Sequence, residues 1–261
     1  MRKIIYLFVA LFLINTTAAW AWGTTGHRVV AEIAERNLTR KAKKNLKKII
    51  GNQKLAYWSN WPDFIKSDSS WKHADGWHYV NVGSDLSISD FGKEMEATTT
   101  ENLYKRTLSL IEELQDKNLP LAKKQENLYF LIHLIGDAHQ PLHVGKAEDL
   151  GGNKIGVEWF GQKTNLHTLW DSKLVDFTQY SYTEFSTVLN IHDKQYNSAL
   201  TQGELVSWLY ESYSTAQRIY DSAQPEAKLS YKYYFDYQKD LEQQLLKGGL
   251  RLAKILNDIY G

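Results

Sequence analysis

The stretch Leu128-Tyr129-Phe130-Leu131-Ile132-His133-Leu134-Ile135-Gly136-Asp137 belongs to the most apolar helical pattern of the chain, residues 123–139. The pattern predicts a buried helix that stops before Pro141. His133 and Asp137 stand four residues apart, so both side chains project from one face of this helix. Polar groups inside a buried helix need a partner, and a metal ion is a suitable one. The stretch therefore predicts a central helix that carries part of a metal site.

Further helical patterns lie on both sides of this segment, while the chain has only four prolines and no β-rich periodicity. A second helix is expected from a Thr39 N-cap to Gly51, and residues 71–90 are expected to be rich in loops. Residues 151–166 predict a small β-hairpin with a Gly161-Gln162 turn. We expect an all-α fold, a single mainly helical domain over residues 22–261 with one small β-hairpin. The other expected elements are a short one at 60–66 and helices at 26–37, 101–117, 167–177, 183–190, 203–222 and 225–259.

The N-terminus has the pattern of a signal peptide over residues 1–21. Arg2 and Lys3 precede an apolar run from Ile4 to Ile14, and Ala19-Trp20-Ala21 fits a signal-peptidase site. The run is too short to span a membrane. Cleavage after Ala21 would make Trp22 the first residue, with a free α-amine five residues before His27. An amine and an imidazole are both zinc ligands; the alternative is that Trp22 is only a linker residue.

Composition limits the classes of function. The chain has no cysteine, although export permits disulfides, so stability must come from the core, from bound metal or from both. Removal of Arg2 and Lys3 leaves a net charge of about −1, which excludes a global basic field for nucleic acid. Attraction to a polyanion must then be local, and metal ions can supply it. Apart from the N-terminus there is no long apolar run, so no stable membrane association is expected.

The eight histidines mostly stand near aspartates. His167 and Asp171 repeat the spacing of His133 and Asp137 on another expected helix. One such pair is usually a surface ion pair, but two pairs with further histidines and an N-terminal amine favour a polynuclear metal site. The pattern His-Glu-x-x-His is absent, as are a Walker loop and a Gly-x-Ser-x-Gly elbow, so the peptidases and hydrolases with these motifs are not indicated. Three other histidines are not expected to be ligands: His73, His139 and His192.

The ordered segments resemble the S-one/P-one family of zinc-dependent, single-strand-specific nucleases. The resemblance covers Trp22 to at least Asp171. It is carried by Trp22-Gly23 with Gly26-His27, Asn60-Trp61-Pro62-Asp63, Trp77-His78-Tyr79-Val80-Asn81, residues 130–137 as quoted above, Gln140-Pro141-Leu142-His143, Gly151-Gly152-Asn153-Lys154 and Asn165-Leu166-His167-Thr168-Leu169-Trp170-Asp171. Bacterial zinc phospholipases C look like distant relatives with a similar ligand set. The resemblance implies the phospholipase C/P-one nuclease-like fold.

The resemblance also implies three zinc ions and nine ligands. One zinc would be held by Asp63, His78 and His133, and another by His143, His167 and Asp171. Trp22, through its amine and carbonyl, would bind the third with His27, and Asp137 would bridge this zinc to the zinc of Asp63. The catalytic residues implied are Asp63, Asp137 and Lys66, where Lys66 stands in place of the usual arginine. The substrate-binding residues implied are Tyr79 and Asn81, which would contact the base, and Asn153, which would line the cleft through its amide or only form the turn.

The reaction expected from this resemblance is hydrolysis of single-stranded DNA and RNA to 5′-phosphonucleotides through a zinc-bridging hydroxide, with 3′-nucleotidase activity alongside. A zinc-dependent phospholipase C and a non-catalytic periplasmic zinc-binding protein are the alternatives. The protein is expected to be a monomer that is periplasmic or secreted. The absence of cysteines, unlike eukaryotic members, indicates a bacterial source.

Two residue clusters have a structural and a functional interpretation. The lysines of residues 41–48 are expected to form a solvated helix face, with backbone binding to nucleic acid as the alternative. Trp58, Trp61, Trp71 and Trp77 are expected mainly to pack around the metal cluster, and the alternative is a platform for nucleotides.

Overall fold

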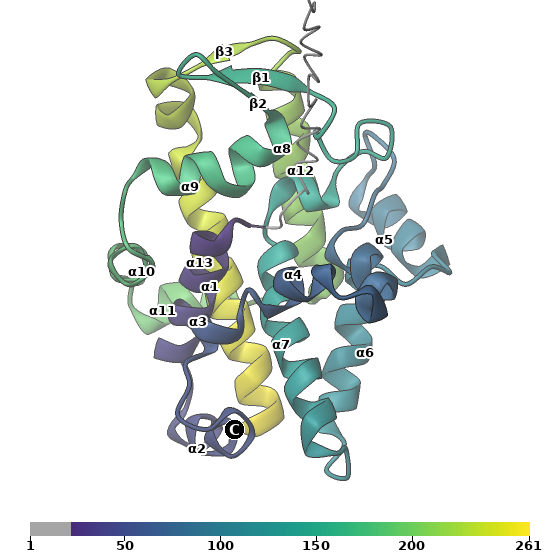
Figure 1. The fold of residues 1–261 in the computed structure, drawn as a ribbon, viewed down its shortest axis with the longest axis vertical. Coiled ribbons are helices and arrows are strands. Elements are labelled where there is room, and N and C mark those ends of the chain that lie inside the picture. Colours follow the sequence, from purple (N-terminus) through teal and green to yellow (C-terminus); the bar gives the residue numbers. More distant parts are fainter. Residues whose placement is uncertain (1–21) are drawn as a thin grey trace, which may run out of the picture.

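The computed structural model describes residues 22–261 (Figure 1), and helix α7 (Leu121–Asp137) lies near its centre. The signal-peptide prediction falls on residues 1–21, outside the described residues. Every α7 residue from Asn127 to Asp137 is buried. A helix that is apolar on all sides must be surrounded by other elements. The buried helix predicted from the sequence is therefore confirmed.

Three helices form most of the packing around α7. Helix α6 (Leu103–Gln115) and helix α13 (Tyr231–Tyr260) flank it, and α1 (Thr24–Arg36) packs against both α7 and α13. Helix α2 (Arg40–Ile50) begins where predicted, because the Thr39 side chain accepts a hydrogen bond from the backbone N–H of Ala42. It ends at Gly51, whose φ of 68° is a left-handed value that suits glycine.

The remaining helical segments are mostly short and connect these larger helices. Helix α12 (Leu205–Ser222) is the longest of them, and Figure 1 shows it behind α8. The others are α3 (Leu55–Trp58), α4 (Trp61–Phe64), α5 (Ile88–Ala97), α8 (Leu166–Thr168), α9 (Leu174–Phe177), α10 (Tyr182–Leu189) and α11 (Lys194–Leu200), with 3₁₀ turns at Ile65–Ser67, Ser69–His78 and Pro141–Val144 and a π turn at Leu169–Lys173.

A small sheet covers one end of the helices. Strands β1 (Gly156–Trp159) and β2 (Gln162–Asn165) form the predicted antiparallel hairpin, with Val157 opposite Thr164. Its turn lies at Phe160 and Gly161, both with positive φ, one residue earlier than predicted. The sheet also has a third strand, β3 (Lys228–Leu229), parallel to β1. The expected continuous helix 225–259 was wrong at its start, because these residues hydrogen-bond to β1 and α13 begins only at Tyr231.

The segment expected to be rich in loops differs most from the prediction. Residues 69–78 form a 3₁₀ helix, and α5 begins at Ile88, near the end of this segment. Helix α5 begins at the Ser87 cap and buries only Phe91 and Met95, so its apolar pattern is weak. Helices α3 and α11 are also absent from the prediction. Such short helices depend on caps and on tertiary packing more than on a periodic pattern.

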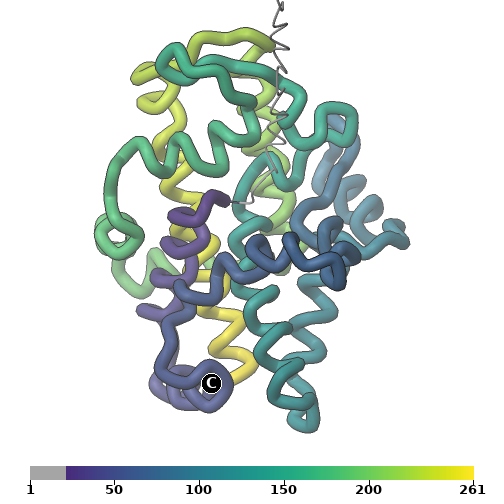
Figure 2. The backbone as a smooth tube through the Cα atoms, viewed as in Figure 1, coloured from purple at the N-terminus to yellow at the C-terminus, as the bar shows by residue number. Residues whose placement is uncertain are grey.

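The first described residues lie in the middle of the molecule (Figure 2). The backbone N–H of Gly23 donates a hydrogen bond of 2.7 Å to the carbonyl oxygen of Asp171, which joins the start of α1 to the π turn. Within residues 22–261, no helix combines the length and the apolar character needed to cross a membrane. The fold thus brings its N-terminal region, α4 and the end of α7 toward one interior point.

Candidate metal centre

The eight histidine and aspartate side chains expected as metal ligands are all buried. They come from α1, α4, α7, α8, two 3₁₀ turns and the π turn, which are far apart in the sequence. They form three groups, of which the first two share His133: His27, Asp63 and His133; His78, His133 and Asp137; and His143, His167 and Asp171. Within each group the ligand atoms lie within 4.8 Å of one another.

The first group of expected ligands meets at the C-terminal part of α7. The Nδ1 atom of His78 is 3.1 Å from Asp137 Oδ2, and the Nε2 atom of His133 is 3.3 Å from the same oxygen. Asp63 Oδ1 approaches from α4, 3.7 Å from His133 Nε2 and 4.0 Å from His78 Nδ1. Two imidazole nitrogens and two carboxylates therefore surround one point.

Asp137 also faces a second group through its other oxygen. Its Oδ1 atom is 3.3 Å from His27 Nε2, while the His27 ring stacks on His133 with centroids 3.8 Å apart. This approach of α1 requires glycine at position 136, because a Cβ there would be 2.6 Å from His27 Nδ1. The geometry leaves each carboxylate oxygen of Asp137 directed at a different set of histidines.

The third group lies on the other side of the same depression. His167 Nε2 is 3.1 Å from Asp171 Oδ2, and His143 Nε2 is 3.6 Å from Asp171 Oδ1. The side-chain amide of Gln140 also donates a hydrogen bond to Asp171 Oδ1, and its Oε1 accepts one from the Leu142 N–H. Gln140 is a positioning residue that the sequence interpretation missed. Its position three residues after the end of α7, in Gln140-Pro141-Leu142-His143, was the available signal.

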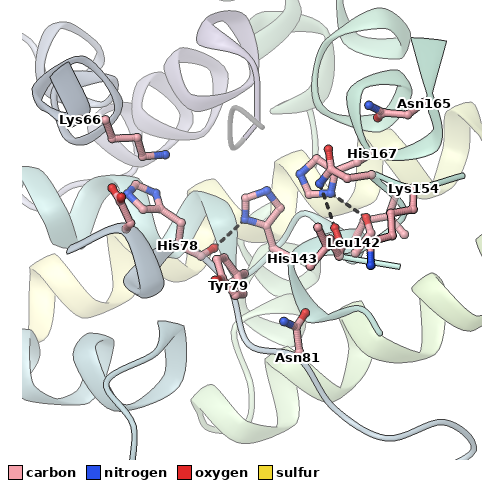
Figure 3. A pocket seen from close by; sticks show the side chains of 13 residues that line it. Lys66, His78, Tyr79, Asn81, Leu142, His143, Lys154, Asn165 and His167 are labelled. Atoms are coloured by element: carbon pink, nitrogen blue, oxygen red, sulfur yellow. Dashed lines mark hydrogen bonds between the residues drawn. The ribbon is translucent and has the colours of Figure 1, made fainter. Parts of the chain in front are cut away.

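Backbone carbonyls fix the orientation of three imidazoles. His133 Nδ1 donates to Ser59 O at 2.7 Å, His143 Nδ1 to His78 O at 2.6 Å and His167 Nδ1 to Gly151 O at 2.7 Å. This tautomer leaves each Nε2 with a lone pair directed at its group, as in histidine metal ligands. Figure 3 shows His78, His143 and His167 in a row across the cavity. Gly151, at φ +62°, also avoids a collision with the Leu142 carbonyl.

Several polar atoms of the cluster have no hydrogen-bond partner among residues 22–261. They are His27 Nδ1 and Nε2, His78 Nε2, Asp137 Oδ1 and His143 Nε2. A buried polar atom without a partner costs about 1–3 kcal/mol, so a protein rarely gathers several in one place without a ligand. Nitrogen and carboxylate donors of this kind suit zinc. The residues present therefore fit a metal-binding role.

Electrostatics within the cluster agree with that role. Burial opposes ionisation of Asp63, but His133 and Lys66 outweigh it and lower the pKa of Asp63 to about 2. Burial lowers the pKa of His133 to about 3, which keeps its imidazole neutral and able to coordinate a metal. Burial also disfavours charge on His143, yet the Asp137 and Asp171 carboxylates raise its pKa to about 9. The two carboxylates thus attract a positive charge into the cluster.

Trp22 is fully buried beside these groups. The bond from the Gly23 N–H to Asp171 O and the packing of the Trp22 side chain against Gly26 hold it at the start of α1, one turn before His27. In the chain described here, the backbone nitrogen of Trp22 belongs to its peptide bond with Ala21. The nitrogen becomes an amine only if that bond is cleaved.

The cluster opens into a cavity of about 440 Å³ (Figure 3). Lys66, Tyr79, Asn81 and Asn153 line it, as expected for groups that contact a ligand. Tyr79 is 45% exposed, so its side chain is accessible from the cavity. Other lining residues were not expected from the sequence: Asp75, Leu150, Lys154 and Asn165.

Two of the expected cavity residues have local partners. Lys66 Nζ is 2.6 Å from Asp63 Oδ1, so its charge is tied to an expected metal ligand while its side chain still reaches the cavity. The Asn153 amide donates to Leu150 O at 2.8 Å and helps to hold the turn around Gly151 and Gly152. Its remaining carbonyl oxygen is available to a ligand.

Comparison with known proteins agrees with this geometry. The family described as S1/P1 Nuclease matches residues 22–261. Endonuclease 5 of Arabidopsis thaliana is 31% identical over 93% of this chain and 91% of its own length. Nuclease P1 of Penicillium citrinum is 27% identical over 92% of this chain and 98% of its own length, and Nuclease S1 of Aspergillus oryzae is 25% identical over 91% of each. The chain therefore belongs to the S1/P1 nuclease family, the family that the sequence resembled.

Proposed function

We propose that residues 22–261 form a trinuclear-zinc enzyme that hydrolyses single-stranded DNA and RNA to 5′-phosphonucleotides and removes the phosphate of 3′-nucleotides. Membership of the family makes the chain a nuclease, a hydrolase of phosphoester bonds. The observation that carries the finer proposal is the buried cluster of unpaired imidazole and carboxylate atoms that opens into a cavity with a half-exposed aromatic ring.

Three ligand sets would hold the zinc ions. Asp63, His78 and His133 make the first set, and His143, His167 and Asp171 the second. Trp22 and His27 make the third, with Asp137 shared between it and the first set. Bound zinc would supply positive charge for the phosphoryl oxygens and a nucleophilic water near neutral pH. The protein side chains supply the fixed positions.

The residues around the cavity would orient the substrate. Lys66 presents a positive charge to a phosphate and keeps Asp63 in place through their 2.6 Å ion pair. A lysine interacts as a point charge and lacks the bidentate fork of an arginine. Tyr79 would stack on a base, and Asn81 would hydrogen-bond it through either its amide N–H or its carbonyl. Stacking needs an unpaired base, which accounts for a preference for single strands.

We also propose that the protein is exported and cleaved after Ala21, which would convert the Trp22 nitrogen into a zinc-binding amine. The match to the family begins at Trp22, and Trp22 lies buried at the cluster. Both observations support this proposal, together with the signal-peptide pattern of residues 1–21.

The test uses protein that begins at Trp22, with its zinc content measured before assay. We expect about three zinc ions per chain and faster hydrolysis of single-stranded than of duplex DNA. Products with 5′-phosphates are expected. Preference for duplex DNA, or hydrolysis that continues in excess chelator, would contradict the proposal.

Two controls separate the proposal from its alternatives. Release of phosphocholine from phosphatidylcholine, without release of nucleotides, would indicate a phospholipase C. Protein that begins at Ala21 instead of Trp22 tests the amine: it should hold two zinc ions tightly and lose most activity. Equal activity of the two forms would remove Trp22 from the ligand set and leave the other eight residues in place.

A further inference from the structure

A second groove lies on the flank of the metal centre, away from the catalytic cavity. It has a volume of about 430 Å³ and is formed by α1, α3, α4 and the start of α10, of which the first three are neighbours in Figure 1. Its walls are mainly aromatic. The lining residues are Arg28, Gln53, Lys54, Ala56, Tyr57, Trp58, Trp61, Phe64 and Tyr182. We name it the aromatic groove.

The aromatic groove combines a rigid wall with exposed rings. Trp58 stacks on Tyr129 at 4.0 Å, and Trp61 packs edge-on against Tyr129, so these two indoles are held by the core. Tyr57 and Phe64 remain 60% and 50% exposed. Large rings left exposed beside a cavity of this size form a typical ligand site. Of the four tryptophans considered as a platform for nucleotides, only Trp58 and Trp61 line this groove, and they form its rigid wall.

The charge of the groove favours an anionic occupant. None of the described residues that line it is acidic. Lys54 is bound to Glu32 at 3.2 Å, so most of its charge is compensated. Arg28 is exposed, and its guanidinium makes no ion pair or hydrogen bond within the described part of the chain. The indole Nε1 of Trp58 is likewise a donor without a partner among these residues. Aromatic faces with a free guanidinium are what a single nucleic-acid strand binds.

The aromatic groove is connected to the catalytic cavity through two elements. On α4, Asp63 belongs to the metal cluster while the next residue, Phe64, lines the groove. On α1, His27 belongs to the cluster and Arg28 lines the groove. Phe64 is also two residues from Lys66, which lines the cavity, so their Cα atoms are at most about 7 Å apart. The two sites are therefore close enough for one short oligonucleotide to reach both.

We propose that the aromatic groove binds the part of a single-stranded substrate that extends beyond the cleaved bond, with bases against Tyr57 and Phe64 and a phosphate at Arg28. The inference rests on the proposed single-strand activity and extends it, because it makes the enzyme favour oligonucleotides over dinucleotides. A dinucleotide fills the catalytic cavity and does not reach the groove.

The test compares a dinucleotide with an oligothymidylate of about twelve nucleotides, on zinc-loaded protein that begins at Trp22. Tyr57→Ala should raise KM for the oligonucleotide by roughly 10-fold, because it removes a ring on which a base would stack, with kcat and the dinucleotide kinetics unchanged. Arg28→Gln should lower the slope of log KM against log salt by about 0.7 for the oligonucleotide. Phe235→Ala, which removes a 74% exposed ring of α13, is the matched control. It should leave KM and kcat unchanged for both substrates.

Two results would overturn the inference. One is an unchanged KM for the oligonucleotide in both groove variants, which would assign the groove to another kind of ligand. The other is an equal loss with both substrates, which would indicate a structural effect on the metal centre. If the unmodified enzyme cleaves neither substrate, the proposed function fails, but anisotropy of a fluorescent oligothymidylate still tests the groove. There, Tyr57→Ala should weaken binding by roughly 10-fold, and equal binding would reject the groove.

Discussion

Two groups of buried polar side chains lie at the C-terminal end of α7, and they differ in whether the protein itself satisfies them. His133 and Asp137 belong to the metal cluster, where several buried atoms of the described residues have no partner. His139, two residues further on, is equally buried, but its Nδ1 donates to Ile135 O at 2.8 Å and its Nε2 accepts from Arg251 Nη1 at 3.0 Å.

The second group is completed by an ion pair. Arg251 is 1% exposed, donates to Leu200 O and forms two hydrogen bonds with Glu211, at 2.9 and 2.8 Å. Burial and the Arg251 charge keep the pKa of His139 well below its usual value, so this imidazole stays neutral. Burial of a polar group therefore does not by itself indicate a binding site. Convergent buried atoms that the protein leaves unpaired do indicate one.

The largest effect is expected from Asp137→Asn. This change removes the carboxylate that faces two ligand groups, and the proposed metal centre would supply several kcal/mol to the reaction. Activity on single-stranded DNA should fall by about 10³-fold, and the zinc content should drop. Asp176→Asn, at an exposed aspartate of α9, is the control and should retain both the activity and the zinc content. Full zinc content and activity in Asp137→Asn would show that the metal cluster, the group with unpaired atoms among the described residues, does not need this carboxylate to bind metal.

Glu211→Gln tests the satisfied group. It leaves the buried Arg251 guanidinium without its carboxylate, so the free energy of unfolding should fall by about 2–3 kcal/mol. The zinc content and kcat should stay at their original values, because the pair lies outside the metal cluster. Denaturant unfolding measures the free energy of unfolding, and metal analysis measures the zinc content. Glu112→Gln, at an exposed glutamate of α6, should be neutral; a loss of zinc in Glu211→Gln would show that the two groups are coupled.

The metal-free protein should lose stability as the pH rises from about 6.5 to about 9. The pKa of His143 is raised from 6.5 to about 9 in the folded state. Its stabilising contribution is therefore complete below 6.5 and is lost as the pH passes 9. The loss amounts to about 3 kcal/mol, since one pKa unit is about 1.4 kcal/mol. Denaturant unfolding at several pH values in excess chelator measures this loss of stability. The variant His143→Gln should remove the pH dependence. Zinc-loaded protein should not show the pH dependence either, because a metal cation takes the place of the proton.

The smallest effect is expected from Gln140→Met. Gln140 holds Asp171 through its side-chain amide, and loss of such a support weakens metal affinity by about 10–100-fold. Competition with a chelator should show one zinc ion released more readily. Gln125→Met is the matched control, because the Gln125 amide binds Ile49 O at 2.7 Å, away from the cluster. Unchanged zinc affinity in Gln140→Met would mean that Asp171 is held in place without Gln140.

Much of the site follows from local spacing. The four-residue steps from His133 to Asp137 and from His167 to Asp171 put each pair on one face, and the structure shows both pairs in contact, at 3.3 and 3.1 Å. Clear helical periodicity likewise predicted the bounds of α1, α2, α6, α7 and α12 to within about two residues. Weak or short patterns did not predict α3, α5 and α11, and a two-residue strand such as β3 has no pattern of its own.

The sequence by itself determined a mainly helical chain of the S1/P1 nuclease family, the buried character of α7 and the identity of the side chains that project from it. The tertiary structure decided which buried histidines find a partner in the protein. His139 meets Arg251, 112 residues away, whereas His27 and Asp137 meet across the Gly136 contact with atoms that no other part of residues 22–261 pairs. It also placed Arg28, Tyr57 and Phe64 around one groove. The physical reason is that periodicity specifies the face of an element, while partners from distant segments are set only when all elements pack together.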